Sequence, residues 1–174
     1  YRGRVNYREL MRQLVAGRQL IRSIAYVVKS EGLDGTVTQV EEGTVSLGRE
    51  AAFFEALEKA GMELRIKDLQ IYADGIKKAD WDVGMAVDAI RMANFLVVII
   101  LVTGDGDFIP LVEYLKWGMG RQVEVAGFEK TTSSRLREAA DRFVALDGVP
   151  KILLRSRSMP RDRTNKTNRS NRIT

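Results

Sequence analysis

The stretch Phe95-Leu96-Val97-Val98-Ile99-Ile100-Leu101-Val102-Thr103-Gly104-Asp105-Gly106-Asp107-Phe108 decides the fold of this chain. Its first eight residues are apolar and mostly β-branched, which is typical of a strand buried on both faces of a parallel sheet. Asp105 and Asp107 therefore follow the end of a strand, where open α/β sheets bind ligands. On an extended chain, carboxylates at this spacing point the same way and can share one hard cation. The alternative is that Asp105 closes a turn and Asp107 caps the next helix.

Strands and helices alternate along the rest of the chain. The pattern predicts strands at 21–28, 62–66, 95–102, 122–126 and 143–146, and helices at 7–17, 49–60, 80–92, 107–117 and 133–141. Asn6 and Asp80 have the positions of helix N-caps, and 68–79 is assigned as loop or mixed structure. Such alternation indicates a parallel sheet with helices on both faces and right-handed crossovers. Because the first predicted element is a helix, we expect that a strand ahead of Tyr1 has been lost.

The composition limits the chemistry that this protein can perform. The chain has 174 residues, enough for one domain with a core, and it contains no cysteine and no histidine. Thiolate and imidazole metal sites, cysteine nucleophiles and Ser-His-Asp triads are thereby excluded. Carboxylate clusters that bind Mg²⁺ or Mn²⁺ remain as the obvious route to catalysis.

The charge of the chain is concentrated at its C-terminus. Residues 155–174 carry seven basic side chains and one acidic one, a net +6, whereas the whole chain carries +5. We therefore expect one domain over residues 1–150 and a basic, disordered tail over 151–174. The tail either adds nonspecific affinity for phosphates or has no role beyond solubility.

The same sequence gives no sign of a membrane protein. The apolar run at 95–102 is far shorter than the roughly 20 residues that span a bilayer, and no signal peptide stands at the start. We expect a cytoplasmic protein without a membrane partner.

Two blocks of the sequence resemble a known family when they are taken together. The segment from Lys78 to Asp88 (KADWDVGMAVD) and the later Thr103–Phe108 (TGDGDF) look like the NYN domain, in particular the LabA-like branch of the PIN-like nuclease superfamily. The similarity covers about residues 4–147. It implies a Rossmann-like three-layer α/β sandwich with a mostly parallel sheet and an acidic cluster at the carboxyl end of that sheet. It also implies divalent-metal-dependent ribonuclease activity.

The resemblance assigns roles to four aspartates. Asp82, Asp105 and Asp107 match the catalytic, metal-binding positions, and Asp88 matches a recurrent aspartate further along the same helix. Asp88 lies six residues after Asp82, about 240° further round a helix, so the two side chains point in different directions. The first acidic residue of the family lies on its first strand, in an Asp-Gly-x-Asn type segment. No such segment occurs here, so one metal ligand and the central strand are expected to be missing.

The implied site makes further expectations about its surroundings. Carboxylates that gather to bind Mg²⁺ or Mn²⁺ repel one another without it, so at least one should have a raised pKa. RNA needs cations around the site, and the candidates are Lys77, Lys78, Lys116 and Arg121. Charged residues such as these are more often ordinary solvated surface than RNA contacts. Trp81 either stacks on a base or covers the core. Gly104 and Gly106 are expected to permit a tight turn beside a ligand.

Three functions follow from these observations. The first is a metal-dependent ribonuclease that uses Asp82, Asp105 and Asp107. The second is a non-catalytic module of the same fold that binds RNA or regulates a protein partner. The third, a phosphatase or other phosphoryl-transfer enzyme, is weaker because the chain has no Gly-rich phosphate loop of the Walker type. A homodimer that uses the segment 68–79 is left open.

Overall fold

The computed structural model describes residues 3–29, 43–71, 77–78 and 80–154, of which 43–49, 70–71 and 77–78 are described by their backbone only. The strands are β1 (Arg4–Val5), β2 (Ile24–Lys29), β3 (Glu63–Asp68), β4 (Gln70–Ile71), β5 (Lys77–Lys78), β6 (Val98–Val102), β7 (Gln122–Gly127), β8 (Arg142–Ala145) and β9 (Leu153–Leu154). The α-helices are α1 (Tyr7–Val15), α2 (Gly43–Lys59), α3 (Asp82–Ala93), α4 (Ile109–Glu113) and α5 (Ser134–Ala139). Short helical turns complete the list: η1 (Gly106–Phe108), η2 (Tyr114–Gly118, a π-helical turn), η3 (Glu129–Thr131) and η4 (Leu146–Gly148).

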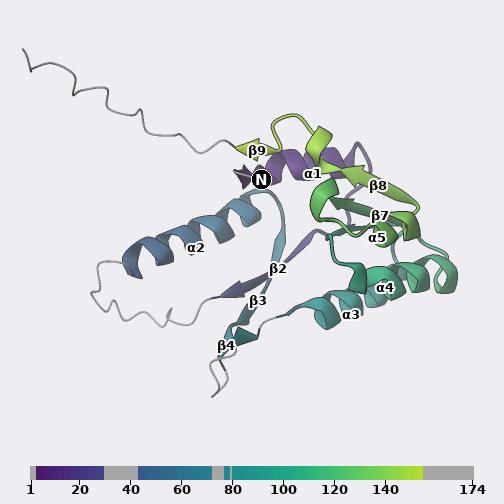
Figure 1. Ribbon diagram of the computed structural model, residues 1–174, viewed down its shortest axis with the longest axis horizontal. Coiled ribbons are helices and arrows are strands. Elements are labelled where there is room, and N and C mark those ends of the chain that lie inside the picture. Colours follow the sequence, from purple (N-terminus) through teal and green to yellow (C-terminus); the bar gives the residue numbers. More distant parts are fainter. Residues whose placement is uncertain (1–2, 30–42, 72–76, 79, 155–174) are drawn as a thin grey trace, which may run out of the picture.

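The parallel strands form two separate pieces within the described residues. One piece pairs β2 with β3, and the other has the order β6-β7-β8, all parallel. The crossovers are α2 in the first piece, and α4 and α5 in the second, as the alternation of elements predicts (Figure 1). Two short antiparallel ladders, β1-β9 and β4-β5, lie outside these pieces. The protein is thus an α/β fold whose parallel strands alternate with helices.

Helices cover both faces of the β6-β7-β8 piece. On one face, α3, α4, η2 and α5 pack against β6 and β7, and the core residues shared by these elements include Ala93, Leu115, Leu136, Ile99 and Val125. On the other face, Leu10 and Leu14 of α1 pack against Ala126 together with the segment that follows β8. The result is a layered sandwich of helices, sheet and helices around β7, whose residues Val123 to Gly127 are all buried.

Helix α3 connects the two pieces of sheet. Its Ala89 and Ala93 belong to the core against β6, whereas Asp88 accepts a hydrogen bond from the Tyr26 hydroxyl of β2 (3.0 Å) and pairs with Arg65 of β3 (3.5 Å). The helix therefore lies over both pieces, although β2 and β6 are not hydrogen-bonded to each other in the described structure.

The local signals in the sequence predict most elements and misplace several ends. Asn6 caps α1, because its side chain accepts a hydrogen bond from the Glu9 amide (3.3 Å). Gly61 has a φ of +86° directly after α2, as expected for a helix stop. The predicted strand over 95–102 is shortened to β6, because Phe95 and Val97 lie 81% and 77% exposed in the loop that precedes it. The expectation of a strand buried on both faces is therefore wrong in part, since Val102 is half exposed as well.

Among the helices in the described part of the chain, none combines the length and the apolar character that crossing a bilayer requires.

Candidate metal and RNA site

The loop after β6 carries the two aspartates that the sequence singles out. The backbone of this loop continues into the 3₁₀ turn η1, and Asp105 is the N-cap of that turn. The Asp105 carboxylate accepts a hydrogen bond from the Asp107 amide (2.9 Å). The Asp105 amide in turn donates to the Thr103 hydroxyl (3.2 Å). One of the two aspartates therefore caps a helical turn, as the alternative interpretation predicts, but the capping residue is Asp105 rather than Asp107. Because Asp107 lies in a 3₁₀ turn, the two residues are not two apart on an extended strand.

The glycines of this loop make room for neighbouring backbone. Neither Gly104 nor Gly106 has a positive φ, so the expected conformational reason for them is wrong. A Cβ at Gly104 would lie 2.4 Å from the Thr131 carbonyl oxygen, and the Gly104 carbonyl accepts a hydrogen bond from the Ser133 amide (2.9 Å). A Cβ at Gly106 would lie 3.1 Å from the Ser133 hydroxyl oxygen. This aspartate loop (residues 103–107) is thus packed closely against the segment that follows β7.

Asp82 lies at the start of α3 and is electrostatically coupled to the aspartate loop. The helix begins at Asp82 with Trp81 as its N-cap residue, so the predicted cap at Asp80 is wrong. The pKa of Asp82 is raised, first by partial loss of hydration and then by the charges of Asp80, Asp105 and Asp107. This agrees with the expectation that at least one carboxylate of the cluster resists ionisation. The negative charges of Asp105 and Asp107 thus lie near enough to Asp82 to disfavour its ionisation.

The donors of these aspartates suit a hard divalent cation. All of them are carboxylate oxygens, which Mg²⁺ and Mn²⁺ prefer, and Mg²⁺ needs only one or two directly. Their arrangement is open, since no three acidic side chains of the described chain lie close enough together to hold one ion. The chemistry of the donor set thus fits a metal, and its closure on one ion would need side-chain movement or a further ligand.

Asp88 does not join this group. Its carboxylate is held by the Tyr26 hydroxyl and by Arg65, on the face of α3 that covers the β2-β3 piece. Loss of hydration, and then the hydrogen bond to Asp88, raise the pKa of Tyr26. Asp88 therefore fastens α3 to the sheet, in line with the helical geometry that separates it from Asp82.

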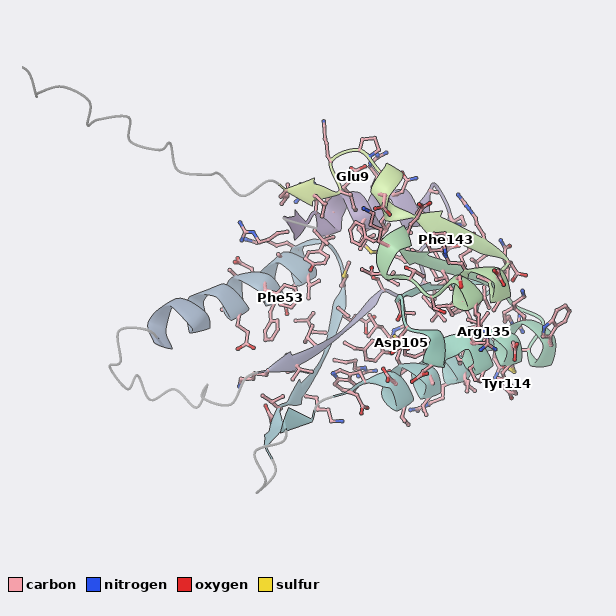
Figure 2. The ribbon with its side chains drawn as sticks, in the orientation of Figure 1. Glu9, Phe53, Asp105, Tyr114, Arg135 and Phe143 are labelled. Carbon is pink, nitrogen blue, oxygen red and sulfur yellow. The ribbon has the colours of Figure 1, made fainter. Side chains whose placement is uncertain are left out.

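Lys116 and Arg121, two predicted RNA contacts, lie at the opposite end of the sheet. Arg121 directly precedes β7, and the amide of Gln122 donates to the carbonyl of Val97, just before β6. The aspartate loop follows the other end of β6, about 16 Å away for five residues of strand. Figure 2 shows Asp105 near the start of α4 and Tyr114 farther along the same helical segment.

Lys116 is also bound within the protein. Its ammonium donates to the carbonyl of Ala139 (2.5 Å) and pairs with Asp141 (3.1 Å). A backbone hydrogen bond from Val123 and this pairing with Lys116 lower the pKa of Asp141. The expectation that Lys116 and Arg121 lie on the rim of the acidic site is therefore wrong. These two residues lie at one end of the sheet, and Asp105 and Asp107 lie at the other end. The side chains of Lys77 and Lys78 in β5 lie outside the described residues.

Trp81 closes the edge of β2 beside the aspartates. Its indole N–H donates to the carbonyl of Val27 (2.9 Å), and its ring lies 5.4 Å from that of Tyr26. A Cβ at Gly84 would lie 2.7 Å from this ring, which explains the glycine one turn into α3. Trp81 thus covers the core, as one of its two expected roles proposes. No pattern in the sequence predicts that the Lys67 ammonium of β3 lies close to the Trp81 ring.

Comparisons with known proteins identify the family of this chain. The family model of the NYN domain matches residues 1–147. A crystal structure of a protein of unknown function from Vibrio parahaemolyticus RIMD 2210633 is 31% identical, with a TM-score of 0.73 over 88% of this chain and 85% of that one. A PLP-bound putative aminotransferase from Clostridium difficile 630 overlaps at 11% identity with a TM-score of only 0.28, over 82% of this chain and 36% of that one. No protein with a curated description matches this sequence. The chain belongs to the NYN domain family, a PIN-like family of suspected ribonucleases.

Proposed function

We propose that this protein is a metal-dependent ribonuclease that hydrolyses phosphodiester bonds with Asp82, Asp105 and Asp107. The observation that supports the proposal is the position of Asp105 and Asp107 in the turn that follows β6, near Asp82 at the start of α3. The pKa of Asp82 is raised by loss of hydration and then by repulsion from Asp80, Asp105 and Asp107. Aspartates that are far apart in sequence gather at the carboxyl end of β6, the end at which α/β sheets bind ligands. Such repulsion costs stability, and a bound cation relieves it.

Each aspartate has a distinct part in this proposal. Asp107 is exposed at the first turn after the strand, which leaves its carboxylate accessible to a cation. Asp105 holds the loop in shape through its bond to the Asp107 amide and keeps its second oxygen for a ligand. Asp82 approaches from α3, the helix that covers both pieces of sheet. The bound Mg²⁺ or Mn²⁺ would supply charge neutralisation at the phosphate and an activated water.

The topology supports a more specific picture of the sheet. We infer that the two parallel pieces belong to one Rossmann-like, PIN-like sheet of order β3-β2-β6-β7-β8, with room for one more strand between β2 and β6. Both β2 and β6 have an edge without a strand partner in the described part of the chain, and α3 lies over both strands. In that order the chain reverses its winding between β2 and β6, and the crevice at such a reversal binds ligands. The aspartate loop follows β6, one of the two strands at this position.

The experiment that tests the activity is cleavage of a labelled RNA by the protein. We expect cutting in Mn²⁺ or Mg²⁺ that EDTA abolishes and that Asp107→Asn or Asp105→Asn lowers about 100-fold or more, because each substitution removes charge that faces the phosphate and metal. Glu113→Gln is the matched control, since it removes the same charge from the exposed surface of α4. Equal rates for Asp107→Asn and the parent protein would refute the proposal.

A second function is favoured by one observation, the open arrangement of the acidic side chains in the described residues. A module that binds RNA without cleaving it needs no closed metal site. Its signature is RNA affinity that survives EDTA and the Asp105→Asn substitution but falls steeply with salt. That result, together with no cleavage by the wild-type protein, would replace the nuclease by the binding module.

A further inference from the structure

One cation stands beside the acidic group and is not neutralised by an ion pair in the described structure. Lys67, near the end of β3, donates from its ammonium to the carbonyl oxygen of Asp80 (3.2 Å). The same nitrogen lies 5.6 Å from the centre of the Trp81 ring. Both partners directly precede Asp82, so the ammonium is positioned next to the start of α3. Neither a carbonyl nor an aromatic face cancels its charge.

Three other cations in or beside the two sheet pieces are paired with carboxylates. Arg22 pairs with Glu63, Arg65 pairs with Asp88, and Lys116 pairs with Asp141 at the far end of the sheet. In each of these pairs a carboxylate already compensates the positive charge. Lys67 is only partly exposed, and its ring contact restricts where the ammonium can lie. Its full charge is therefore held in a defined place.

We infer that Lys67 is a phosphate-contact residue for RNA, positioned by Trp81 at the edge of the aspartate group. The inference rests on the proposed function and adds a substrate-binding residue to it. An acidic site repels the RNA backbone, so a neighbouring fixed cation lowers the cost of bringing a phosphate close. On binding, the Lys67 ammonium exchanges the Asp80 carbonyl for a phosphate oxygen, an acceptor with which hydrogen bonds are stronger.

Trp81 is the positioning residue in this arrangement. Its indole is fixed at three places, by the Val27 carbonyl, the Tyr26 ring and the close approach of Gly84. The ring therefore presents a fixed face to Lys67. A phosphate contact made from a preorganised side chain loses less conformational entropy than one made from a freely moving lysine.

The test measures binding without metal, so that it does not depend on cleavage. A fluorescently labelled single-stranded RNA of about 12 nucleotides is titrated with protein in EDTA, from about 50 mM to 200 mM salt. We expect Lys67→Ala to weaken binding roughly five- to tenfold at the lowest salt and to reduce the slope of log K against log salt by about 0.7. Lys67→Arg should restore most of the affinity, because it keeps the charge.

The matched control is Lys59→Ala, which removes the same charge from α2, where Lys59 pairs with Glu55 (2.5 Å). Equal affinity and equal salt slope for the Lys67→Ala and Lys59→Ala proteins would overturn the inference. A loss of affinity that Lys67→Arg does not restore would also overturn it, because that pattern marks a structural defect. Since EDTA is present throughout, failure of the nuclease proposal would leave this result unaffected.

Discussion

Gly104 shows at the residue scale how one missing side chain permits the candidate site. Its backbone runs against the segment after β7, so that a Cβ would lie 2.4 Å from the carbonyl oxygen of Thr131. Gly127, at the end of β7, is equally confined, since its Cβ would lie 2.3 Å from the Thr132 hydroxyl oxygen. The aspartate loop and its neighbour are therefore locked together by backbone contact, which fixes where Asp105 and Asp107 lie.

Gly104→Ala is expected to lower the free energy of unfolding by about 1–3 kcal/mol, because the backbone must shift to admit the methyl group. Since the shift displaces the aspartate loop, metal-dependent cleavage should fall more than stability does. Gly148→Ala is the control, because nothing lies within 4 Å of a Cβ at Gly148. Urea unfolding of both variants measures the difference, and equal midpoints would show that the contact is not tight.

Helix α1 and strand β7 illustrate, at the scale of elements, how a buried charge holds two layers together. Arg18, just after α1, makes a two-pronged contact with Glu124 of β7 through distances of 3.0 and 3.1 Å. Glu124 is only 2% exposed, and Arg142 adds a third contact at 3.7 Å. Arg18 also donates to the carbonyls of Leu14 and Val15, which closes the C-terminal end of α1. One side chain thus neutralises a buried carboxylate and caps a helix.

Arg18→Ala is expected to lower the free energy of unfolding by about 3 kcal/mol, because it leaves the buried Glu124 carboxylate with only the more distant contacts from Arg142 (3.7 Å) and the Gln122 side-chain amide (3.4 Å). Arg12→Ala is the matched control, since Arg12 lies in α1 and pairs with Glu9 at the exposed surface. That variant should change stability little, as exposed ion pairs contribute little. Thermal and urea unfolding compare the two, and a similar loss for both would contradict a special role for the buried pair.

The molecule as a whole consists of two parallel sheet pieces of unequal completeness. In the described structure β7 has a partner on each side and is almost wholly buried, whereas β2 has a partner on one side only. Its other edge is covered at one point, where the Trp81 indole binds the Val27 carbonyl. Among the described residues, β7 is therefore paired along both edges, whereas no strand pairs with the edge of β2 that faces away from β3.

Hydrogen exchange should report this difference between the pieces. The amides of β7 are expected to exchange near the rate of global unfolding, whereas those of β2 that face away from β3 should exchange at least about 100-fold faster. The amides of β2 that bond to β3 serve as the internal control. If the β2 amides that face away from β3 were as well protected as those of β7, a further strand would have to pair with β2 in solution.

The sequence by itself did not predict the short strands β1, β4, β5 and β9, but it determined the α/β class and the alternation of the longer strands and helices. These features follow from local causes, namely apolar runs, N-caps such as Asn6 and the stop at Gly61, which act over a few residues. The resemblance to the NYN family is visible in equally local blocks, around Asp82 and around Asp105, and the family model matches residues 1–147.

Tertiary structure alone decided which of these residues meet. It gathered Asp82 with the aspartate loop, drew Asp88 to Tyr26 and Arg65, and placed Lys116 and Arg121 at the far end of the sheet. It also set Lys67 over Trp81, a contact between elements that nothing in either segment announces. The physical reason is that strand pairing and crossovers bring distant segments together, whereas sequence patterns record only what neighbouring residues prefer.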